Sequence, residues 1–303
     1  MHRLSKFVIA SLCGAMALIT RAGASYELLM VADGLTDSVH RYDSMTGTYL
    51  GSFGSGYMSA PAHITADSTT GRAYVTNFIA RNVQTWDYST GVLLNEWSVS
   101  GTPWGITRLA TGNLLVGTST GVKEYTITGT KVRDFLGLYG VGTDGTNIYT
   151  AADNQVRKFS PSGLLLGTFS SGTDTIFQFA FRQGTAYGTG GTNSAYFGSF
   201  NSVTMSGYGQ LPVSNLASGY RIDGIAMGHA NFAYLSGRLP LDPTKGVISR
   251  YNVAERRGYS SFGSAQLKDP RGIATVIAPE PGTLFALGLG VVCVFRRRRQ
   301  STR

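Results

Sequence analysis

The sequence holds few side chains that could carry acid–base or metal chemistry. Three histidines, His40, His63 and His229, lie between residues 25 and 277, and their spacing matches no metal-ligand motif. The metalloprotease motif H-E-x-x-H and a Lys-containing phosphate loop are both absent from the chain. We therefore expect a non-enzyme with no catalytic residues, no metal site and no cofactor.

Three residues are our candidates for contacting a ligand. Asp223, in the stretch R-I-D-G-I-A-M, stands near the expected start of a strand, and we rank it first. His229 also lies close to such a strand, and Trp104 offers an indole on which a ligand could stack. His63 could approach the same place as His229, and a purely structural role is the alternative for both histidines.

The remaining aspartates divide into turn residues and loop residues. Asp67 and Asp144 stand in T-A-D-S-T-T-G and G-T-D-G-T-N, where Asx turns account for them, and Asp43 and Asp87 precede Thr-Gly turns. A second group lies in loops whose oxygen atoms could bind Ca²⁺. That group is Asp33, Asp37 and Asp153. Because no D-x-D-x-D-G loop occurs, a Ca²⁺ site is only the alternative to a metal-free protein.

Aromatic residues are the other source of ligand contacts. We expect most of them to pack between sheets, and a minority to be available for stacking on the faces of sugar rings. The aromatic residues that we single out are Trp86, Trp97, Trp104, Tyr139, Phe177 and Tyr220.

Composition and charge narrow the class of protein. The chain has 303 residues, of which 40 are Gly and only 14% are charged, and this balance with many aromatic residues favours an all-β protein. The formal net charge is +9, but residues 1–24 carry +3 and residues 282–303 carry +5. The body is therefore near neutral and has no electrostatic footprint for nucleic acid. Both cysteines, Cys13 and Cys293, lie in the end segments, so the body has no disulfide.

The body is built from repeats. Residues 61–101, 102–137 and 138–172 each read as an apolar strand, a polar turn, a second strand, a third strand and a fourth. The third strand ends in Trp-Asp-Tyr, Lys-Glu-Tyr or Arg-Lys-Phe before a Ser/Thr-Gly turn. Residues 173–212 and 213–263 form two less regular units, the second with an insertion at 237–246. Four-stranded units of 35–41 residues are the signature of a β-propeller, with a β-sandwich as the alternative.

The two ends of the body predict how the ring closes. Residues 25–56 contain the second, third and fourth strands of a unit, and residues 268–276 form a lone first strand. Pairing these segments completes a sixth blade and removes exposed sheet edges. We therefore predict an all-β, six-bladed β-propeller over residues 25–277, closed by N- and C-terminal strands. The P-x-G-I-A starts and the Y-D-x-x-T-G ends resemble NHL or YVTN repeats, a likeness of fold that does not give function.

The N-terminal segment has the pattern of a secretory signal peptide. Arg3 and Lys6 precede an apolar run over residues 7–20, which is too short for a comfortable membrane span. Small residues follow, and we assign Ala22, Ala24 and Ser25 to the signal peptidase cleavage site. Residues 1–24 are therefore predicted to be removed, with a buried helix as the alternative.

The C-terminal segment combines a proline motif, an apolar stretch and a basic end. Pro279, Glu280 and Pro281 come first, and residues 282–295 form a short apolar helix of roughly 21 Å, less than the roughly 30 Å of a hydrocarbon core. Four arginines stop the segment on the cytoplasmic side of a membrane. These are Arg296, Arg297, Arg298 and Arg299. A plain tail anchor is the alternative.

This C-terminal arrangement over residues 278–303 resembles a PEP-CTERM sorting signal. The resemblance implies an exosortase-type processing protease as a partner, and a Gram-negative host that secretes exopolysaccharide. It also implies a transient anchor in the inner membrane, followed by the cell envelope or extracellular matrix as the final location.

We accordingly expect a non-catalytic, exported binding module of the cell surface or matrix, linked to exopolysaccharide or biofilm. Two alternatives stay open. One is a metal-dependent propeller enzyme of the lactonase or lyase type, and the other is a purely structural surface protein.

Overall fold

The computed structural model describes residues 25–171, 176–190, 196–213, 216, 219–239 and 242–279. Every helix or strand within these ranges is a β-strand, and none of their elements is a helix able to cross a membrane. The predicted cleavage residues Ala22 and Ala24, most of the sorting motif and the basic end lie outside the described residues. Pro279, the first residue of the motif, is the last residue of the final strand.

Twenty-four strands make up the described fold. In chain order they are β1 (Ser25–Asp33), β2 (Ser38–Asp43), β3 (Tyr49–Phe53), β4 (Pro61–Asp67), β5 (Arg72–Asn77), β6 (Asn82–Asp87), β7 (Val92–Ser98), β8 (Pro103–Arg108), β9 (Leu114–Thr118), β10 (Gly121–Tyr125), β11 (Lys131–Phe135), β12 (Leu138–Thr143), β13 (Ile148–Ala152), β14 (Gln155–Phe159), β15 (Leu165–Ser170), β16 (Ile176–Arg182), β17 (Thr185–Gly190), β18 (Tyr196–Asn201), β19 (Ser206–Gln210), β20 (Arg221–Met227), β21 (Phe232–Leu239), β22 (Asp242–Asn252), β23 (Arg257–Phe262) and β24 (Pro270–Pro279).

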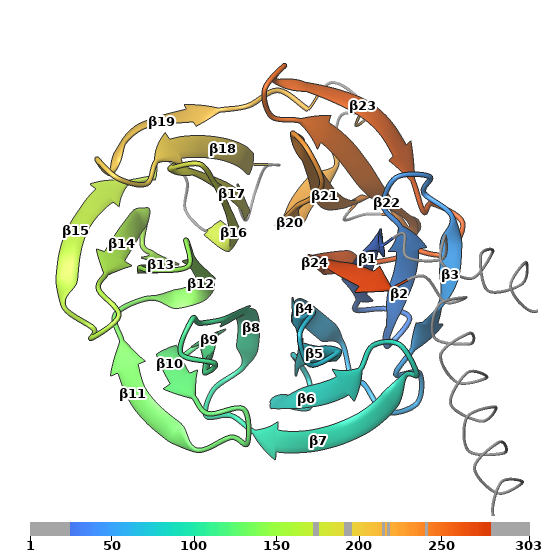
Figure 1. The fold of residues 1–303 in the computed structure, drawn as a ribbon, viewed down its shortest axis with the longest axis horizontal. Coiled ribbons are helices and arrows are strands. Elements are labelled where there is room, and N and C mark those ends of the chain that lie inside the picture. The colour runs from blue at the N-terminus through green and yellow to red at the C-terminus, as the bar shows by residue number, and fades with distance from the viewer. Residues whose placement is uncertain are drawn as a thin grey trace, which may run out of the picture. The chain divides into compact units, whose positions relative to one another are not determined.

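These strands form antiparallel sheets arranged around a central axis, the arrangement of a β-propeller (Figure 1). Four sheets have four strands each, and one sheet has eight. The eight-stranded sheet consists of two antiparallel halves, β12–β15 and β16–β19, that meet in a single parallel bridge between Val141 and Gln178. The predicted repeat boundaries are confirmed, because each predicted unit corresponds to four consecutive strands. The insertion at 237–246 lengthens the β21–β22 hairpin, in which Leu239 pairs with Asp242.

The described chain contains one compact unit, Leu28–Val276. Residues 25–27 begin β1 and residues 277–279 end β24. The predicted joining of the two ends is confirmed, because β24 pairs with β1 in the sheet β24-β1-β2-β3.

An aspartate fastens this joint. Asp33, the buried last residue of β1, accepts hydrogen bonds through Oδ2 from the backbone N–H groups of Lys268 (2.6 Å) and Asp269 (3.1 Å). Its Oδ1 accepts two more from Leu35 and Thr36, both at 3.1 Å. Four backbone donors thus hold one carboxylate, and hydrogen bonds to an ionised acceptor are stronger than neutral ones.

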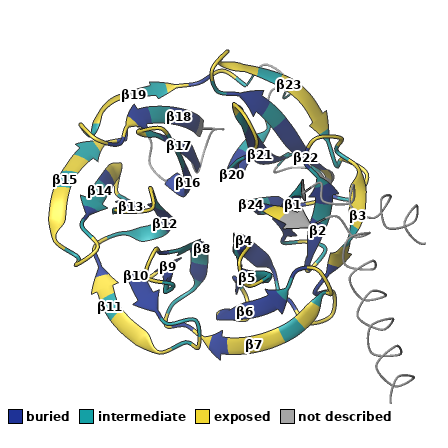
Figure 2. Ribbon diagram, in the orientation of Figure 1, coloured by how far each residue is buried: buried dark blue, intermediate teal, exposed yellow. Residues whose placement is uncertain are grey.

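Hydrophobic packing lies mainly between neighbouring sheets. Tyr74 and Trp97 from one sheet, for example, pack with Ile106, Leu114 and Tyr125 from the next. The fourth strands form the rim and are largely exposed, whereas the inner strands are mostly buried (Figure 2). The apolar side chains of the inner strands therefore point to both faces of each sheet, as expected for stacked blades.

Crowding near the central axis explains why a glycine stands close to the start of both β8 and β24. A Cβ on Gly272 of β24 would overlap the backbone of His63, and a Cβ on Gly105 of β8 would overlap the carbonyl oxygen of Tyr139. Neither glycine has a left-handed backbone, so the requirement is for space alone. The P-x-G pattern in the sequence therefore marks the places where first strands approach each other most closely.

Replacing Gly272 with Ala should lower the free energy of unfolding by about 1–3 kcal/mol, because the added methyl group forces the backbone of β24 away from β4. Gly209→Ala is the control, since a Cβ at Gly209 meets nothing within 4 Å. Urea denaturation of both variants measures the difference. Equal stability of the two would contradict the packing described here.

Candidate ligand site at the channel mouth

The strands β4, β8, β12, β16, β20 and β24 lie nearest the central axis (Figure 1). Residues at or near the starts of several of these strands contact one another at one end of the axis. We call this end the channel mouth. A connected set of side chains lies there, which we call the mouth cluster. Its members are Trp104, Phe177, Arg221, Asp223, Arg238, Asp269 and Arg271.

Trp104 is the residue around which the mouth is organised. The half-buried indole belongs to β8, and its ring centroid lies 5.1 Å from that of Phe177, which belongs to β16. Further aromatic rings surround it at centroid distances of 5.4 Å for Phe78, 6.1 Å for His63 and 6.5 Å for Tyr139. Trp104 therefore lies among aromatic side chains that come from several sheets.

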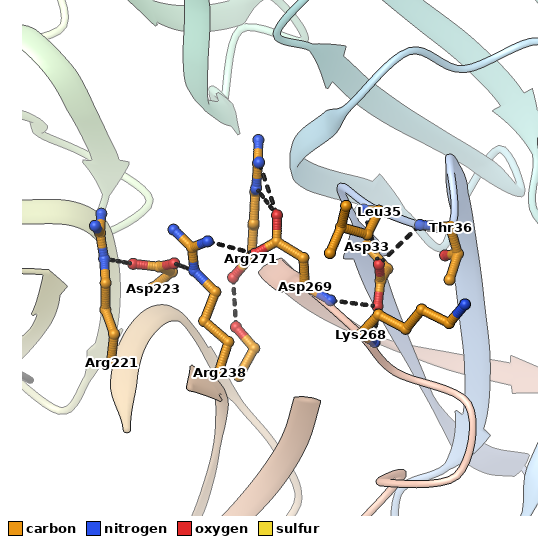
Figure 3. A network of polar contacts seen from close by, with 10 residues as sticks. Asp33, Leu35, Thr36, Arg221, Asp223, Arg238, Lys268, Asp269 and Arg271 are labelled. Atoms are coloured by element: carbon orange, nitrogen blue, oxygen red, sulfur yellow. Dashed lines mark hydrogen bonds and ion pairs between the residues drawn. The ribbon is translucent and has the colours of Figure 1, made fainter. Parts of the chain in front are cut away.

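A chain of ion pairs runs along the other side of the mouth (Figure 3). Arg221 Nε lies 2.6 Å from Asp223 Oδ1, and Asp223 Oδ2 lies 2.8 Å from Arg238 Nε. Arg238 Nη1 then lies 2.6 Å from Asp269 Oδ1, whose second oxygen lies 2.7 Å from Arg271 Nη2. The side chains of the three arginines are only 15–20% exposed, so their charges are screened by water less than those of surface pairs.

The two ends of this ion-pair chain rest on the aromatic rings. The guanidinium of Arg271 lies over Trp104 at 5.3 Å from the ring centroid, and that of Arg221 lies over Phe177 at 4.8 Å. Since Trp104 and Phe177 contact each other, the mouth cluster forms a closed circuit of ion pairs, cation–π contacts and ring contacts. Such a circuit fixes each guanidinium in one orientation before any ligand arrives.

Asp223 lies at the mouth, but its carboxylate is already occupied. The residue is fully buried, and each of its oxygens faces an arginine. The sequence placed Asp223 correctly near a strand start, and its buried carboxylate holds Arg221 and Arg238 in position. Contact between Asp223 and a ligand stays a prediction.

His229 does not join this site. It is an exposed residue in the turn between β20 and β21, where its carbonyl oxygen accepts a hydrogen bond from the backbone N–H of Phe232 at 3.2 Å. Asp223 stands near the start of β20, and His229 follows the end of the same strand, so the two lie at opposite ends of it. Of the three candidate contacts, Trp104 and Asp223 belong to the mouth cluster and His229 does not.

The other two histidines of the body are buried. Burial lowers the pKa of His63 to about 3, with a further contribution from the positive charge of Arg271. Burial also lowers the pKa of His40, against the opposing effect of Asp33, and His40 Nε2 lies 2.9 Å from the hydroxyl of Thr36. Both rings are therefore neutral at physiological pH, and neither serves as a proton donor there.

The loop aspartates do not converge. The carboxylate of Asp33 is held by the ring closure, Asp37 Oδ1 accepts a hydrogen bond from the backbone N–H of Ala60 at 2.7 Å, and Asp153 lies in the β13–β14 turn. Within the described ranges, no three His, Cys, Asp or Glu side chains are grouped as metal ligands would be.

The predicted turn roles are confirmed. Asp43, Asp67, Asp87 and Asp144 each accept hydrogen bonds from backbone N–H groups two or three residues ahead, as Asx turns require. One further stretch, Gly117-Thr118-Ser119-Thr120-Gly121, has the G-x-S-x-G spacing of a hydrolase nucleophile elbow. It forms the β9–β10 hairpin turn, so strand β10 follows it in place of the helix that follows a nucleophile elbow. Ser119 Oγ accepts a hydrogen bond from Thr102 N–H at 3.0 Å.

A glutamine bridges the wall of the channel in its middle. Gln178 of β16 donates through Nε2 to the carbonyl oxygen of Ile273 at 3.0 Å, and its Oε1 accepts from the backbone N–H of Ile225 at 3.2 Å. A hollow of ≈ 210 Å³ includes Gln178 in its lining and extends toward the ends of the first strands, where Thr107 and Thr275 line it. The residues that line this hollow include no member of the mouth cluster.

The remaining aromatic candidates have packing roles or lie beside the mouth. Trp86 and Trp97 are buried, with ring centroids 5.5 Å from Phe53 and 4.7 Å from Tyr125. Tyr220 is half-buried and precedes Arg221 in the chain.

The sequence reasoning missed the arginines. The available signal was an arginine at or near the start of a first strand, in R-I-D-G and P-R-G.

Comparison with known sequences identifies the C-terminal segment. Residues 278–299 match the PEP-CTERM protein-sorting motif. The motif indicates a protein that is exported to the cell envelope of a Gram-negative bacterium, carries a C-terminal anchor and is processed by exosortase-type machinery. No curated protein matches the chain.

Comparison with solved structures supports the propeller-like fold. A chain of a nidogen/laminin complex aligns with a TM-score of 0.66 at 12% identity, over 83% of this chain and 99% of that one. A protein of unknown function from Bacteroides caccae aligns with a TM-score of 0.64 at 14% identity, over the same shares. Hydrazine synthase from Kuenenia stuttgartiensis aligns with a TM-score of 0.52 at 15% identity, over 71% of this chain and 70% of that one. At such identities the similarity shows the fold alone.

The buried, neutral His63 makes stability depend on pH. Because its folded pKa of about 3 lies below the ordinary value of 6.5, the unfolded chain binds a proton more readily, and stability falls as pH drops from 6.5 toward 3. The loss expected from this residue is about 1.4 kcal/mol per pH unit.

Replacing His63 with Phe should remove this contribution. Urea denaturation at pH 6.5, 5.5 and 4.5 should therefore show a shallower decline for the variant than for the natural protein. His40 is retained in both and cancels in the comparison. Parallel declines would contradict the assignment to His63.

Proposed function

We propose that this protein is an exported, six-bladed β-propeller that binds a component of the cell surface or extracellular matrix without catalysis. The blade count treats the two halves of the eight-stranded sheet as two blades and the sheet closed by β24 as one. The binding role rests chiefly on the mouth cluster, in which an indole and three guanidiniums are held in fixed orientations at an end of the central channel.

A matrix polysaccharide is the ligand class that fits this surface best. Sugars present both an apolar ring face, which stacks on an indole, and hydroxyl groups, which accept hydrogen bonds from guanidinium nitrogens. The sorting motif supports the same reading, because it directs the protein to the cell envelope, where such polysaccharides occur. We place signal-peptide cleavage at Ala22, Ala24 and Ser25, and the transient anchor in residues 282–295.

Catalysis at the mouth is disfavoured by the state of its titratable groups. Both aspartates of the mouth cluster are engaged with arginines, and His63 is buried and neutral. A general acid or base needs a titratable group that can reach the substrate. The metal-dependent enzyme and the purely structural protein remain the two competing functions, and the next experiment separates them from a binding module.

The exported protein should be retained by the exopolysaccharide of its producing cell in a saturable way, with or without a chelator. Replacing Trp104 with Ala should weaken retention about tenfold or more, which corresponds to about 1.4 kcal/mol, because the stacking surface is lost. Tyr259→Ala is the control, since Tyr259 is an exposed aromatic residue of the rim strand β23. Binding that disappears with chelator would favour the metal-dependent enzyme, and no binding at all would favour the structural protein.

Processing at the sorting motif has its own test. The mass of the surface-exposed protein should lack Arg296, Arg297, Arg298 and Arg299, and replacing Pro279, Glu280 and Pro281 with alanines should retain the chain in the inner membrane. Pro161→Ala, in an exposed turn of the body, should leave export unchanged. An intact basic end on all of the surface material would overturn processing.

A further inference from the structure

We propose that the mouth cluster recognises a carboxylated sugar, so that the ligand is an acidic polysaccharide containing uronate residues. This inference rests on the proposed function and specifies the chemistry of its ligand. Three observations carry it: hydrogen-bond donors without partners, an excess of cations, and the pairing of guanidinium with aromatic surface.

The donors without partners lie together. Nη1 of Arg271 and Nε1 of Trp104 are buried nitrogens that have no hydrogen-bond partner among the described residues. The guanidinium of Arg271 lies over the indole of Trp104, so the two donors belong to neighbouring side chains. Both ring nitrogens of His63, which is completely buried against the same indole, also lack a partner there. A buried donor without a partner lowers stability, and an acceptor placed nearby would recover that loss.

Arg221 adds donors that reach the surface. Within the part of the chain that the structure describes, its Nε is bonded to Asp223, and no bond is formed by its two terminal nitrogens. Its side chain is 19% exposed, and Phe177 supports the guanidinium from one side. The planar fork of a guanidinium matches the two oxygens of a carboxylate, which makes arginine the preferred partner for that group.

The charges of the network in Figure 3 favour an anion over a neutral ligand. Within the mouth cluster, the carboxylates of Asp223 and Asp269 form ion pairs with three guanidiniums. These belong to Arg221, Arg238 and Arg271. One positive charge is therefore left over, at a place where the arginines are mostly shielded from water and electrostatic attraction is stronger than in bulk solvent.

The geometry also indicates that the anion is attached to a ring. Trp104 and its aromatic neighbours place apolar ring surface beside the guanidinium of Arg271. A uronate satisfies both halves of the surface at once, because its ring face can stack on aromatic and guanidinium planes while its carboxylate accepts from arginine. A free small anion would use only the arginines.

The test compares a polyuronate with its neutral counterpart. The mature exported protein is applied to immobilised polygalacturonate and to the same polymer after chemical reduction of its carboxyl groups, with a chelator present throughout. We expect binding to polygalacturonate that weakens with added salt, and binding at least tenfold weaker to the reduced polymer. Equal binding to the two polymers, or to dextran sulfate, would overturn carboxylate recognition.

Variants at Arg221 locate the interaction. Arg221→Gln should weaken binding to polygalacturonate about tenfold or more. The affinity of Arg221→Lys should lie between those of the natural protein and Arg221→Gln, because lysine keeps the charge without the planar fork. Folding should survive, since Asp223 keeps its contact with Arg238. Arg257→Gln is the matched control, because Arg257 lies over Tyr259 at 4.7 Å on the rim strand β23 and is 62% exposed. Unchanged binding by Arg221→Gln would overturn the assignment.

The two proposals fail differently. If the producer's own matrix retains the protein and polygalacturonate does not, the uronate inference is overturned while the binding function stands. If neither material retains the protein, both are overturned.

Discussion

The rest of the structure depends on the closure of the ring by strands from both ends of the body. β24 pairs with β1, and the carboxylate of Asp33 binds the backbone N–H groups of Lys268 and Asp269 just before β24 begins. A sheet in a ring cannot be completed locally, so the chain must bring together segments more than 230 residues apart. Two hydrogen bonds to the buried carboxylate of Asp33 cross this joint and set its register, and two local ones from Leu35 and Thr36 hold the same carboxylate in place.

Closure also builds the candidate site. Asp269 and Arg271 follow the joint directly, and they complete the ion-pair chain that begins at Arg221. Without β24, Arg238 would lose Asp269 as a partner, and Trp104 would lose the guanidinium that lies over it. The same strand carries Pro279, where the sorting motif begins, so a single strand connects the mouth of the propeller to the signal that determines its cellular location.

The sequence alone predicted the features that arise from local signals. The repeat period and turn aspartates such as Asp87 were readable, because strand alternation and Asx turns depend on neighbouring residues. The pairing of the two ends was readable because each end carries only part of a repeat. The whole mouth cluster was not readable, because its ring contacts join residues of different sheets, as Trp104 does with Phe177 and Arg271. Asp223 was therefore predicted as a ligand contact although arginines occupy it. His229 was grouped with it although strand β20 separates them.

The account's central claim is that ligand covers the mouth, and hydroxyl-radical footprinting tests it most directly, since it reports the solvent access of individual side chains. With saturating matrix polysaccharide, oxidation of the half-buried Trp104 and Tyr139 should fall, whereas oxidation of the exposed rim residues Tyr49 and Tyr259 should not change. Protection of the rim residues with Trp104 and Tyr139 left unprotected would show that the ligand binds elsewhere, and would contradict the account.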